Sequence, residues 1–201
     1  KNFCSTFSSM SRKDFPDYLP NTYDGYYLYP EYKTSHLNPE YTRADEVIAG
    51  RETRVFKEAA EVIKAGKLGD KFHAISDAHA EMMIKVAEAI AFNTLGRFIL
   101  IVENNGAIAN MQDDAMVEVV CELGINGPRP MSVGNIPQFY LGLLVQQVSS
   151  EKLLVDAYYE HSYQKALEAF TLNRLINDAK VARKILDALI EANKGMWPEL
   201  K

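Results

Sequence analysis

Three short runs of β-prone apolar residues lie close together in the middle of this 201-residue chain, between longer stretches with helical spacing. The first run, residues 98–102, reads as a buried strand and stops at an Asn-Asn-Gly turn signal. The second covers residues 116–121, and the third, residues 131–133, follows a Gly- and Pro-containing turn. Short strands with such close connections predict a small antiparallel sheet.

A helical pattern precedes the predicted sheet. Pro39 fits a first helical position, Thr42 and Asp45 have the spacing of a capping box, and Gly66 marks the expected end. The apolar residues of this helix lie on one face, which we expect to be buried: Ile48, Val55, Phe56, Ala59, Val62 and Ile63.

Further helices are predicted on both sides of the strands, and no repeat or linker separates them. They are expected from Ser76 to about Ala91, from Pro137 to about Leu172 with a candidate interruption at Ser149 and Ser150, and around residues 181–192 with Gly195 as C-cap. The predicted fold is therefore one α+β domain of helices packed around a small antiparallel sheet.

Composition and charge exclude several functions. The net charge is −5 and the basic residues are dispersed, so no basic stripe indicates a nucleic-acid partner. No apolar run is long enough to cross a bilayer and no signal peptide is recognisable, so we expect a cytoplasmic protein without a membrane partner. Cys4 and Cys121 form neither a disulfide framework nor a zinc motif.

The start of the chain suggests a piece of a longer protein. It begins with Lys1, and it contains no Gly-x-Gly-x-x-Gly, phosphate-cradling loop or Gly-x-Ser-x-Gly motif. A complete enzyme would usually show more of these signals.

Tyrosine is concentrated near the N-terminus, where seven of the eleven tyrosines fall between Tyr18 and Tyr41. A phenol offers a flat face to a sugar ring and an oxygen that binds or moves a proton. Tyr23 lies in a loop flanked by Pro and Gly, of the kind that presents a side chain to a cleft. The alternative is an aromatic loop packed on a core.

Arg43 is a candidate anion ligand, because it falls in the first turn of a predicted helix, whose free N–H groups already favour negative charge. An ordinary surface arginine is the alternative. His36, His73, His79 and His161 have no ligand spacing, so we predict no metal site from them. Asp113 and Asp114 are expected to be solvated rather than an acid and base pair.

Several segments together resemble the C-terminal part of glycoside hydrolase family 4, whose members depend on NAD and a divalent metal, and most of all its 6-phospho-α-glucosidases. The likeness covers nearly the whole chain. It is carried by Leu19-Pro20-Asn21-Thr22-Tyr23, Asn38-Pro39 with Thr42-Arg43-Ala44, residues 101–110, residues 115–119, Ile136-Pro137-Gln138-Phe139, Gln146-Gln147-Val148, residues 191–194 and Trp197-Pro198-Glu199-Leu200.

The resemblance implies an unusual hydrolysis of phosphorylated disaccharides such as maltose 6-phosphate. In this family NAD takes hydride from C3 of the sugar, a tyrosinate removes the acidified C2 proton, the leaving group departs from C1, and hydride is finally returned. By motif position, Tyr23 matches the tyrosine base and Arg43 matches the arginine that contacts the 6-phosphate. A turn at the cleft edge, or a purely structural turn, is expected at Asn104, Asn105 and Gly106.

The family's glycine-rich loop, metal-binding Cys and His, and acidic residue belong to a preceding half that this chain lacks. The resemblance thus implies one C-terminal domain over residues 1–201, inactive alone, in a homo-oligomeric enzyme whose NAD and metal, expected to be manganese, are held mainly by the other half. It also implies the fold of the second domain of lactate and malate dehydrogenases. Two alternatives stay open: a non-catalytic helical assembly module with tyrosines at its interface, and the dehydrogenase domain itself.

Overall fold

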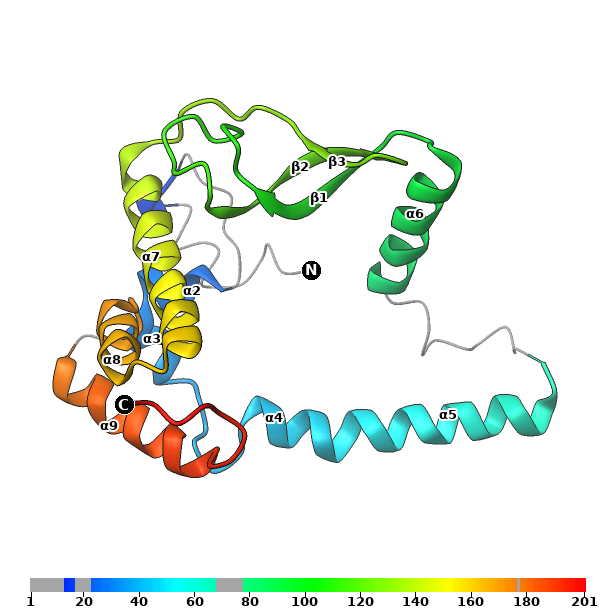
Figure 1. Cartoon of the computed structure of the whole chain (residues 1–201). Coiled ribbons are helices and arrows are strands. Elements are labelled where there is room, and N and C mark those ends of the chain that lie inside the picture. Colours follow the sequence, from blue (N-terminus) through cyan, green and yellow to red (C-terminus); the bar gives the residue numbers. More distant parts are fainter. Residues whose placement is uncertain (1–12, 17–22, 68–77, 177) are drawn as a thin grey trace. The chain divides into compact units, whose positions relative to one another are not determined.

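The computed structural model describes residues 13–16, 23–67, 78–176 and 178–201, which form two compact units (Figure 1). The first unit contains the described residues up to Thr34, together with Ile101–Val117 and Ser132–Lys201. The second contains the described parts of Ser35–Leu100 and Glu118–Met131.

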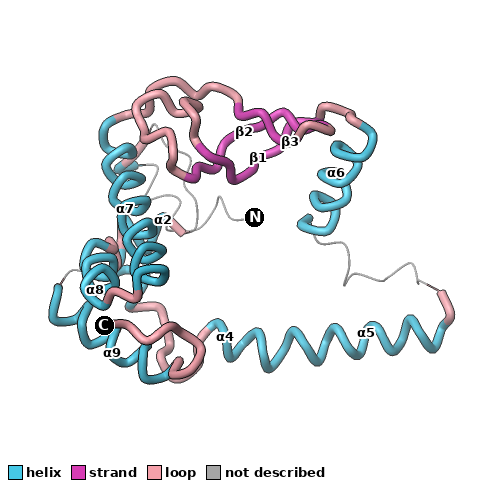
Figure 2. The backbone as a smooth tube through the Cα atoms, viewed as in Figure 1, coloured by secondary structure: helices cyan, strands magenta, loops and turns pink. Residues whose placement is uncertain are grey.

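The predicted sheet is present and makes the fold α+β, as expected from the sequence (Figure 2). Its three strands, β1 (Gly96–Glu103), β2 (Met116–Gly124) and β3 (Gly127–Pro130), lie in the order β1-β2-β3. Strands β2 and β3 are antiparallel and joined by a tight turn, with Gly124 opposite Gly127. The turn requires glycine at position 127, whose φ is 86°.

The third strand begins earlier than predicted. Residues 131–133 lie outside it, although the Met131 nitrogen still donates to the Val120 oxygen at 2.9 Å. The sequence obscured β3 because it contains Pro128 and Pro130, and prolines argue against a strand. They are tolerated here because β3 is at the edge of the sheet.

The prediction that β1 is buried was wrong. Its residues alternate between half-buried and exposed, and Ile99 and Ile101 are 57% and 69% exposed. On β2, by contrast, Val117, Val119 and Cys121 are buried on one face. An apolar run does not distinguish these cases, because branched residues favour strands whether or not anything covers them.

Helices of the first unit are α2 (Asp24–Leu28), α3 (Pro30–Thr34), α7 (Gln138–Glu160), α8 (Tyr163–Leu172) and α9 (Ala179–Ala192). Helix α8 packs against both α7 and α9 (Figure 1). The buried cluster between these helices consists of Ala157, Ala166, Leu167, Ala182 and Leu186. Small residues at most of these positions let the helix backbones approach closely.

The break between α7 and α8 lies at His161 rather than at Ser149 and Ser150. His161 adopts the left-handed conformation with φ 56° and ends α7. The two serines stay helical because the Ser149 hydroxyl donates to the Val145 carbonyl at 2.8 Å, and the Ser150 hydroxyl donates to Ala169 of α8 at 2.9 Å. The last helix ends at Ala192, and its C-cap is Asn193, two residues before the predicted C-cap Gly195.

The second unit contains the helix predicted from the capping box. It runs as α4 (Arg43–Glu46), the π-helical turn η2 (Val47–Arg51) and α5 (Glu52–Ala65), followed by α6 (Ala78–Phe92). Thr42 is the N-cap with a complete capping box, and Gly66 follows the end with φ 65°, as predicted. Pro39 lies in a turn before the helix instead of at its first position. The predicted cap Ser76 is outside the described residues.

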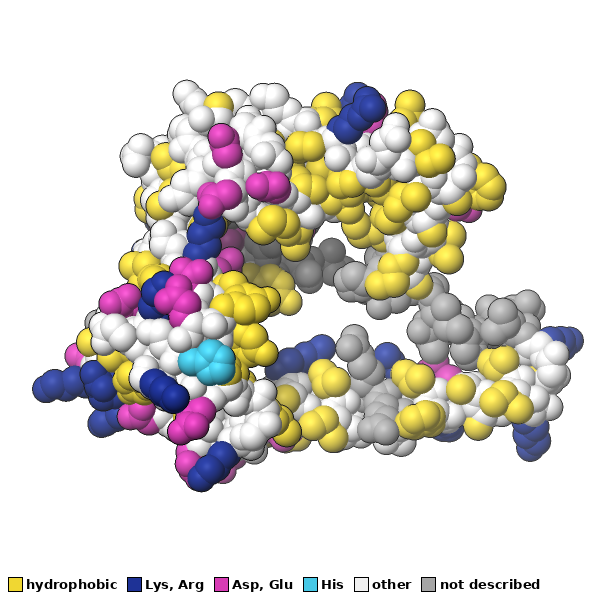
Figure 3. All heavy atoms as spheres, viewed as in Figure 1, with side chains coloured by type: hydrophobic (Ala, Val, Ile, Leu, Met, Phe, Trp, Pro, Cys, Tyr) yellow, Lys and Arg dark blue, Asp and Glu magenta, His cyan; other side chains and the backbone are white. Residues whose placement is uncertain are grey.

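The apolar face predicted to be buried on α5 is uncovered in its own unit. Val55 is 45% exposed, Phe56 65% and Ile63 81%. Figure 3 shows hydrophobic side chains along this helix. Helix α6 likewise exposes Met83 and Ile84. None of the helices in the described part of the chain is long and apolar enough to cross a membrane.

Candidate functional site

Tyr23 stands at the N-terminal end of helix α2. Its carbonyl accepts the Tyr26 amide at 3.0 Å, so its backbone belongs to the first helical turn, with φ −76° and ψ −25°. Tyr23 is 69% exposed, so it lies at the surface of the first unit and is not packed into a core. That its side chain faces a cleft stays a prediction. Asn21 and Thr22, which precede it, lie outside the described residues.

Tyr29, six residues later, has very different surroundings. Its hydroxyl donates to the Asp14 Oδ2 at 2.6 Å, and its ring meets Phe15 edge to face at 6.4 Å between centroids. Partial burial and then the Asp14 carboxylate raise the pKa of Tyr29 to about 12. Tyr29 is therefore harder to ionise than an ordinary tyrosine, which makes it less suited to act as a base.

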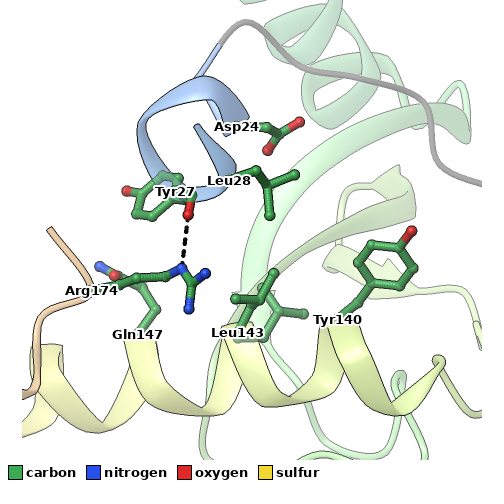
Figure 4. Close-up of a pocket in the computed structure, with 8 residues that line it drawn as sticks. Asp24, Tyr27, Leu28, Tyr140, Leu143, Gln147 and Arg174 are labelled. Atoms are coloured by element: carbon green, nitrogen blue, oxygen red, sulfur yellow. Dashed lines mark hydrogen bonds between the residues drawn. The ribbon is translucent and has the colours of Figure 1, made fainter. Parts of the chain in front are cut away.

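Helix α2 is anchored to the segment after α8. The Arg174 Nε donates to the Tyr27 carbonyl at 2.9 Å, across 147 residues of sequence. Beside this bond lies a cavity of about 330 Å³ within the first unit (Figure 4). Asp24, Tyr27 and Leu28 line it from α2, Tyr140, Leu143, Leu144 and Gln147 from α7, and Arg174 completes it. This cavity could not be predicted from the sequence, because it is formed by residues far apart in the chain.

Arg43 is the first residue of α4, in the second unit. Asp45 accepts the Thr42 amide at 2.8 Å, and this capping box fixes the start of the helix. Hydrogen bonds from Thr42 hold the pKa of Asp45 below its ordinary value. The Arg43 guanidinium is exposed and pairs with Glu46. Both border an open hollow of about 320 Å³, together with Val47, Gly50 and a second arginine, Arg54.

Tyr23 and Arg43 belong to different units. The structure therefore describes Tyr23 and Arg43 each within its own unit. Their roles as base and phosphate ligand stay predictions.

Asn104 organises the loop after β1. Its side chain is fully buried, its Nδ2 donates to the carbonyls of Ile108, Met111 and Gln112 at 3.1–3.2 Å, and its Oδ1 accepts the Ile108 amide at 2.7 Å. The turn predicted here is confirmed by the left-handed φ angles of Asn105 and Gly106, 41° and 80°. Both polar atoms of the Asn104 side chain are thus hydrogen-bonded within the loop, which gives Asn104 a structural role.

Asn110 has a similar task that the sequence did not reveal. Its Oδ1 accepts the Ile136 amide at 3.0 Å and its Nδ2 donates to the Ile136 carbonyl at 2.9 Å. These two hydrogen bonds hold the loop against Ile136, the residue just before Pro137, which is the N-cap of α7. The position of α7 therefore depends on the loop after β1.

The remaining candidates form no metal centre within the described residues, where no group of three His, Cys, Asp or Glu side chains could hold an ion. His36 lies beside the Ser35 hydroxyl at 3.1 Å, His161 ends α7, and His73 is outside the description. Asp114 forms an ion pair with Lys152 at 2.5 Å, and this hydrogen bond lowers its pKa. Asp114 is thus exposed, as predicted, but paired.

The two cysteines remain without a ligand role in the part of the chain that the structure covers. Cys121 is fully buried in β2, and burial raises the pKa of its thiol. Burial and a raised pKa both disfavour the thiolate, which is the reactive form of a cysteine. Cys4 lies outside the described residues.

Comparison with known proteins gives a consistent result. Residues 6–176 match the family described as "Family 4 glycosyl hydrolase C-terminal domain". The chain is 53% identical over 187 residues to a maltose-6'-phosphate glucosidase of Fusobacterium mortiferum, covering 92% of this chain and 42% of the relative.

Solved structures agree. A crystal structure of a 6-phospho-α-glucosidase from gut microorganisms, in complex with NAD and Mn²⁺, is 82% identical with a TM-score of 0.89. A second 6-phospho-α-glucosidase from gut microorganisms, in complex with NAD and glucose-6-phosphate, is 48% identical with a TM-score of 0.88. Each match covers 96% of this chain and 44% of the other. The chain thus spans less than half the length of these relatives.

Proposed function

The chain belongs to glycosyl hydrolase family 4, in its C-terminal domain, and we propose that it is the substrate-binding half of a 6-phospho-α-glucosidase. The observation that supports this most is the 82% identity to a 6-phospho-α-glucosidase over 96% of the chain. The substrate class is a 6-phospho-α-glucoside such as maltose 6'-phosphate, which one relative's name states.

Tyr23 is proposed as the base that removes the proton from C2 of the sugar. Its exposed phenol, at the first turn of a helix that Arg174 anchors, can reach a substrate outside the unit. A free phenol has a pKa near 10, so a tyrosinate base needs positive charge nearby. Tyr29 is less suited to this task, since its raised pKa and its bond to Asp14 make it harder to ionise.

Arg43 is proposed to bind the 6-phosphate. A guanidinium can form two parallel hydrogen bonds to phosphate oxygens, and the hollow beside it is open to solvent. The neighbouring Arg54 adds positive charge to the same hollow, while Glu46 is the group that a phosphate would displace from Arg43.

NAD and the divalent metal, manganese in our proposal, are assigned mainly to the part of the enzyme outside this chain. The described residues offer no metal-ligand cluster, so they do not fit the ion by themselves. When bound, NAD supplies reversible oxidation of the sugar at C3, which acidifies the C2 proton. The chain's own contribution is to hold the phosphate and move the proton. We further propose a cytoplasmic enzyme.

The test is hydrolysis of maltose 6'-phosphate by the full-length enzyme with NAD and Mn²⁺. Replacing Arg43 by Met should raise KM about 10- to 100-fold, because a hydrogen bond to a charged group contributes about 1.5–3 kcal/mol. Arg54→Met is the matched control in the same hollow and should raise KM less than Arg43→Met does. Equal KM values for Arg43→Met and the unmodified enzyme would contradict the assigned role.

A second property, homo-oligomerisation, is proposed from the uncovered apolar faces. Phe56 and Ile63 on α5 are 65% and 81% exposed, and a second copy of the enzyme would remove them from water. The alternative from the sequence is a helical assembly module without a catalytic role. Such a module would share this apolar surface, but Arg43 would not contribute to any affinity for a sugar phosphate.

A further inference from the structure

The cavity beside helix α2 has the size and shape of a small-ligand site. Its volume of about 330 Å³ is at the lower end of the range for ligand pockets. Figure 4 shows Asp24 and Leu28 of α2 on one side, and Tyr140, Leu143 and Gln147 of α7 on the other. Because α2 and α7 belong to one compact unit, the cavity does not depend on how the units are arranged.

Its lining combines apolar walls with a few polar groups. Tyrosine rings and leucines form the walls, and Asp24, Gln147 and Arg174 supply a carboxylate, an amide and a guanidinium. Gln147 Nε2 donates to Glu151 at 2.7 Å, which leaves its Oε1 as an acceptor without a partner among the described residues. Arg174 uses Nε for the Tyr27 carbonyl, and its two terminal nitrogens likewise bond to no other described residue.

These groups suit an uncharged, hydroxylated ring. A sugar offers hydroxyls that both donate and accept, and apolar C–H faces that pack on aromatic rings. The lining carries one acidic and one basic side chain, so it has no excess positive charge for a phosphate. The phosphate has a separate candidate at Arg43 and Arg54, in the second unit.

We propose that this cavity binds the leaving-group sugar, the ring released when the phosphorylated glucoside is cleaved. Asp24, which lines the cavity, directly follows Tyr23, so the cavity and the proposed base both lie at the N-terminal end of α2, although Tyr23 itself does not line the cavity. Gln147 and Arg174 bind the ring's hydroxyls, and the tyrosines and leucines pack on its faces. This inference rests on the proposed function and adds the residues that select the leaving group.

The test compares two substrates of the full-length enzyme that differ only in the leaving group. Maltose 6'-phosphate releases glucose, and 4-nitrophenyl α-glucoside 6-phosphate releases a nitrophenol with few hydrogen-bonding groups. Gln147→Leu keeps the apolar wall and removes the amide. It should raise KM for maltose 6'-phosphate about 5- to 10-fold, the effect of one hydrogen bond, and change KM for the nitrophenyl substrate less than about twofold.

Gln164→Leu is the matched control. Like Gln147, Gln164 donates from its Nε2 to the glutamate four residues later, here Glu168 at 2.9 Å. Gln164 lies on α8, however, and does not line this cavity. It should leave both KM values unchanged. The affinity for glucose 6-phosphate, which lacks a leaving group, should be the same in all three enzymes.

Two results overturn the proposal. Unchanged KM values in Gln147→Leu would show that the amide does not contact the substrate, and an equal rise for both substrates would show a structural effect without selectivity. If the unmodified enzyme hydrolyses neither substrate, the proposed function is wrong, and so is the leaving-group site, which rests on it.

Discussion

Two tyrosines of one short segment differ because of their surroundings, first in burial and then in the contact with Asp14. Tyr29 donates to Asp14 and is partly buried, whereas Tyr23 is 69% exposed at the start of α2. Composition shows both as members of one cluster. Only the surroundings distinguish a phenol that resists ionisation from one that can meet a substrate.

The Tyr29 phenol should resist ionisation. Its pKa is raised to about 12 from an ordinary value of 10, so folding favours the protonated form. The resulting stabilisation is fully present below pH 10 and is lost as the pH rises from 10 towards 12.

The measurement is the phenolate absorbance at pH 10 of the full-length enzyme, minus that of its Tyr29→Phe variant. An ordinary phenol is half ionised at this pH, whereas Tyr29 should be about 1% ionised. A difference spectrum that shows half a phenolate would contradict the assigned surroundings.

Some residue roles could be predicted from the sequence and others could not. The turn at Asn105 and Gly106 was predictable, because both residue types tolerate a left-handed backbone. The roles of the buried Asn104 amide and the half-buried Asn110 amide were not, since their partners include carbonyls up to 26 residues away. The aromatic cluster drew attention to Tyr23, but nothing in the sequence pointed to Arg174, whose partner is 147 residues distant.

At the scale of elements, the capping box at Thr42 is the clearest case in which a short pattern specified the local structure. It fixes where α4 begins and therefore where Arg43 lies. Helices α7 and α9 were also predictable from periodicity and from Pro137. The break at His161, the π-helical turn and the proline-containing strand β3 were not, because tertiary contacts decide them.

The capping box should make the start of α4 sensitive to acid. Hydrogen bonds from Thr42 lower the pKa of Asp45 below 3.8, so the stabilisation is present above that pH. It is lost as the pH falls through the lowered folded-state value. Thr42→Ala should remove this dependence and increase exchange of the first amides of α4 about fivefold at pH 7, since a threonine cap contributes about 1 kcal/mol.

Hydrogen exchange at pH 7 and at pH 3, followed by mass spectrometry, measures both effects. Thr171→Ala is a suitable control, because the Thr171 hydroxyl bonds inside α8 to the Leu167 carbonyl and caps no helix. Equal exchange in Thr42→Ala and the unmodified enzyme would contradict the capping role.

The whole chain spans 42–44% of the length of its close relatives, and its α5 face is apolar and exposed. The sequence predicted an apolar face on α5 but not what covers it, because the apolar pattern of a helix does not identify the surface that packs on it.

Ile63→Glu should weaken assembly of the full-length enzyme. Placing a charge where an isoleucine is removed from water should raise the dissociation constant about a hundredfold, measured by sedimentation. Lys64→Glu, at the adjacent exposed position, is the control for charge alone and should assemble like the unmodified enzyme. An identical mass and dissociation constant for Ile63→Glu would show that α5 is not the interface between copies.

The role proposed for Tyr23 is removal of the C2 proton. The most direct measurement is exchange of that proton with solvent, followed by NMR as the full-length enzyme turns over its phosphorylated glucoside in heavy water with NAD and Mn²⁺. Tyr23→Phe should abolish the exchange while NAD binding is retained, and Tyr159→Phe, 76% exposed in the unmodified chain, should exchange normally. Exchange at the unmodified rate in Tyr23→Phe would contradict the account.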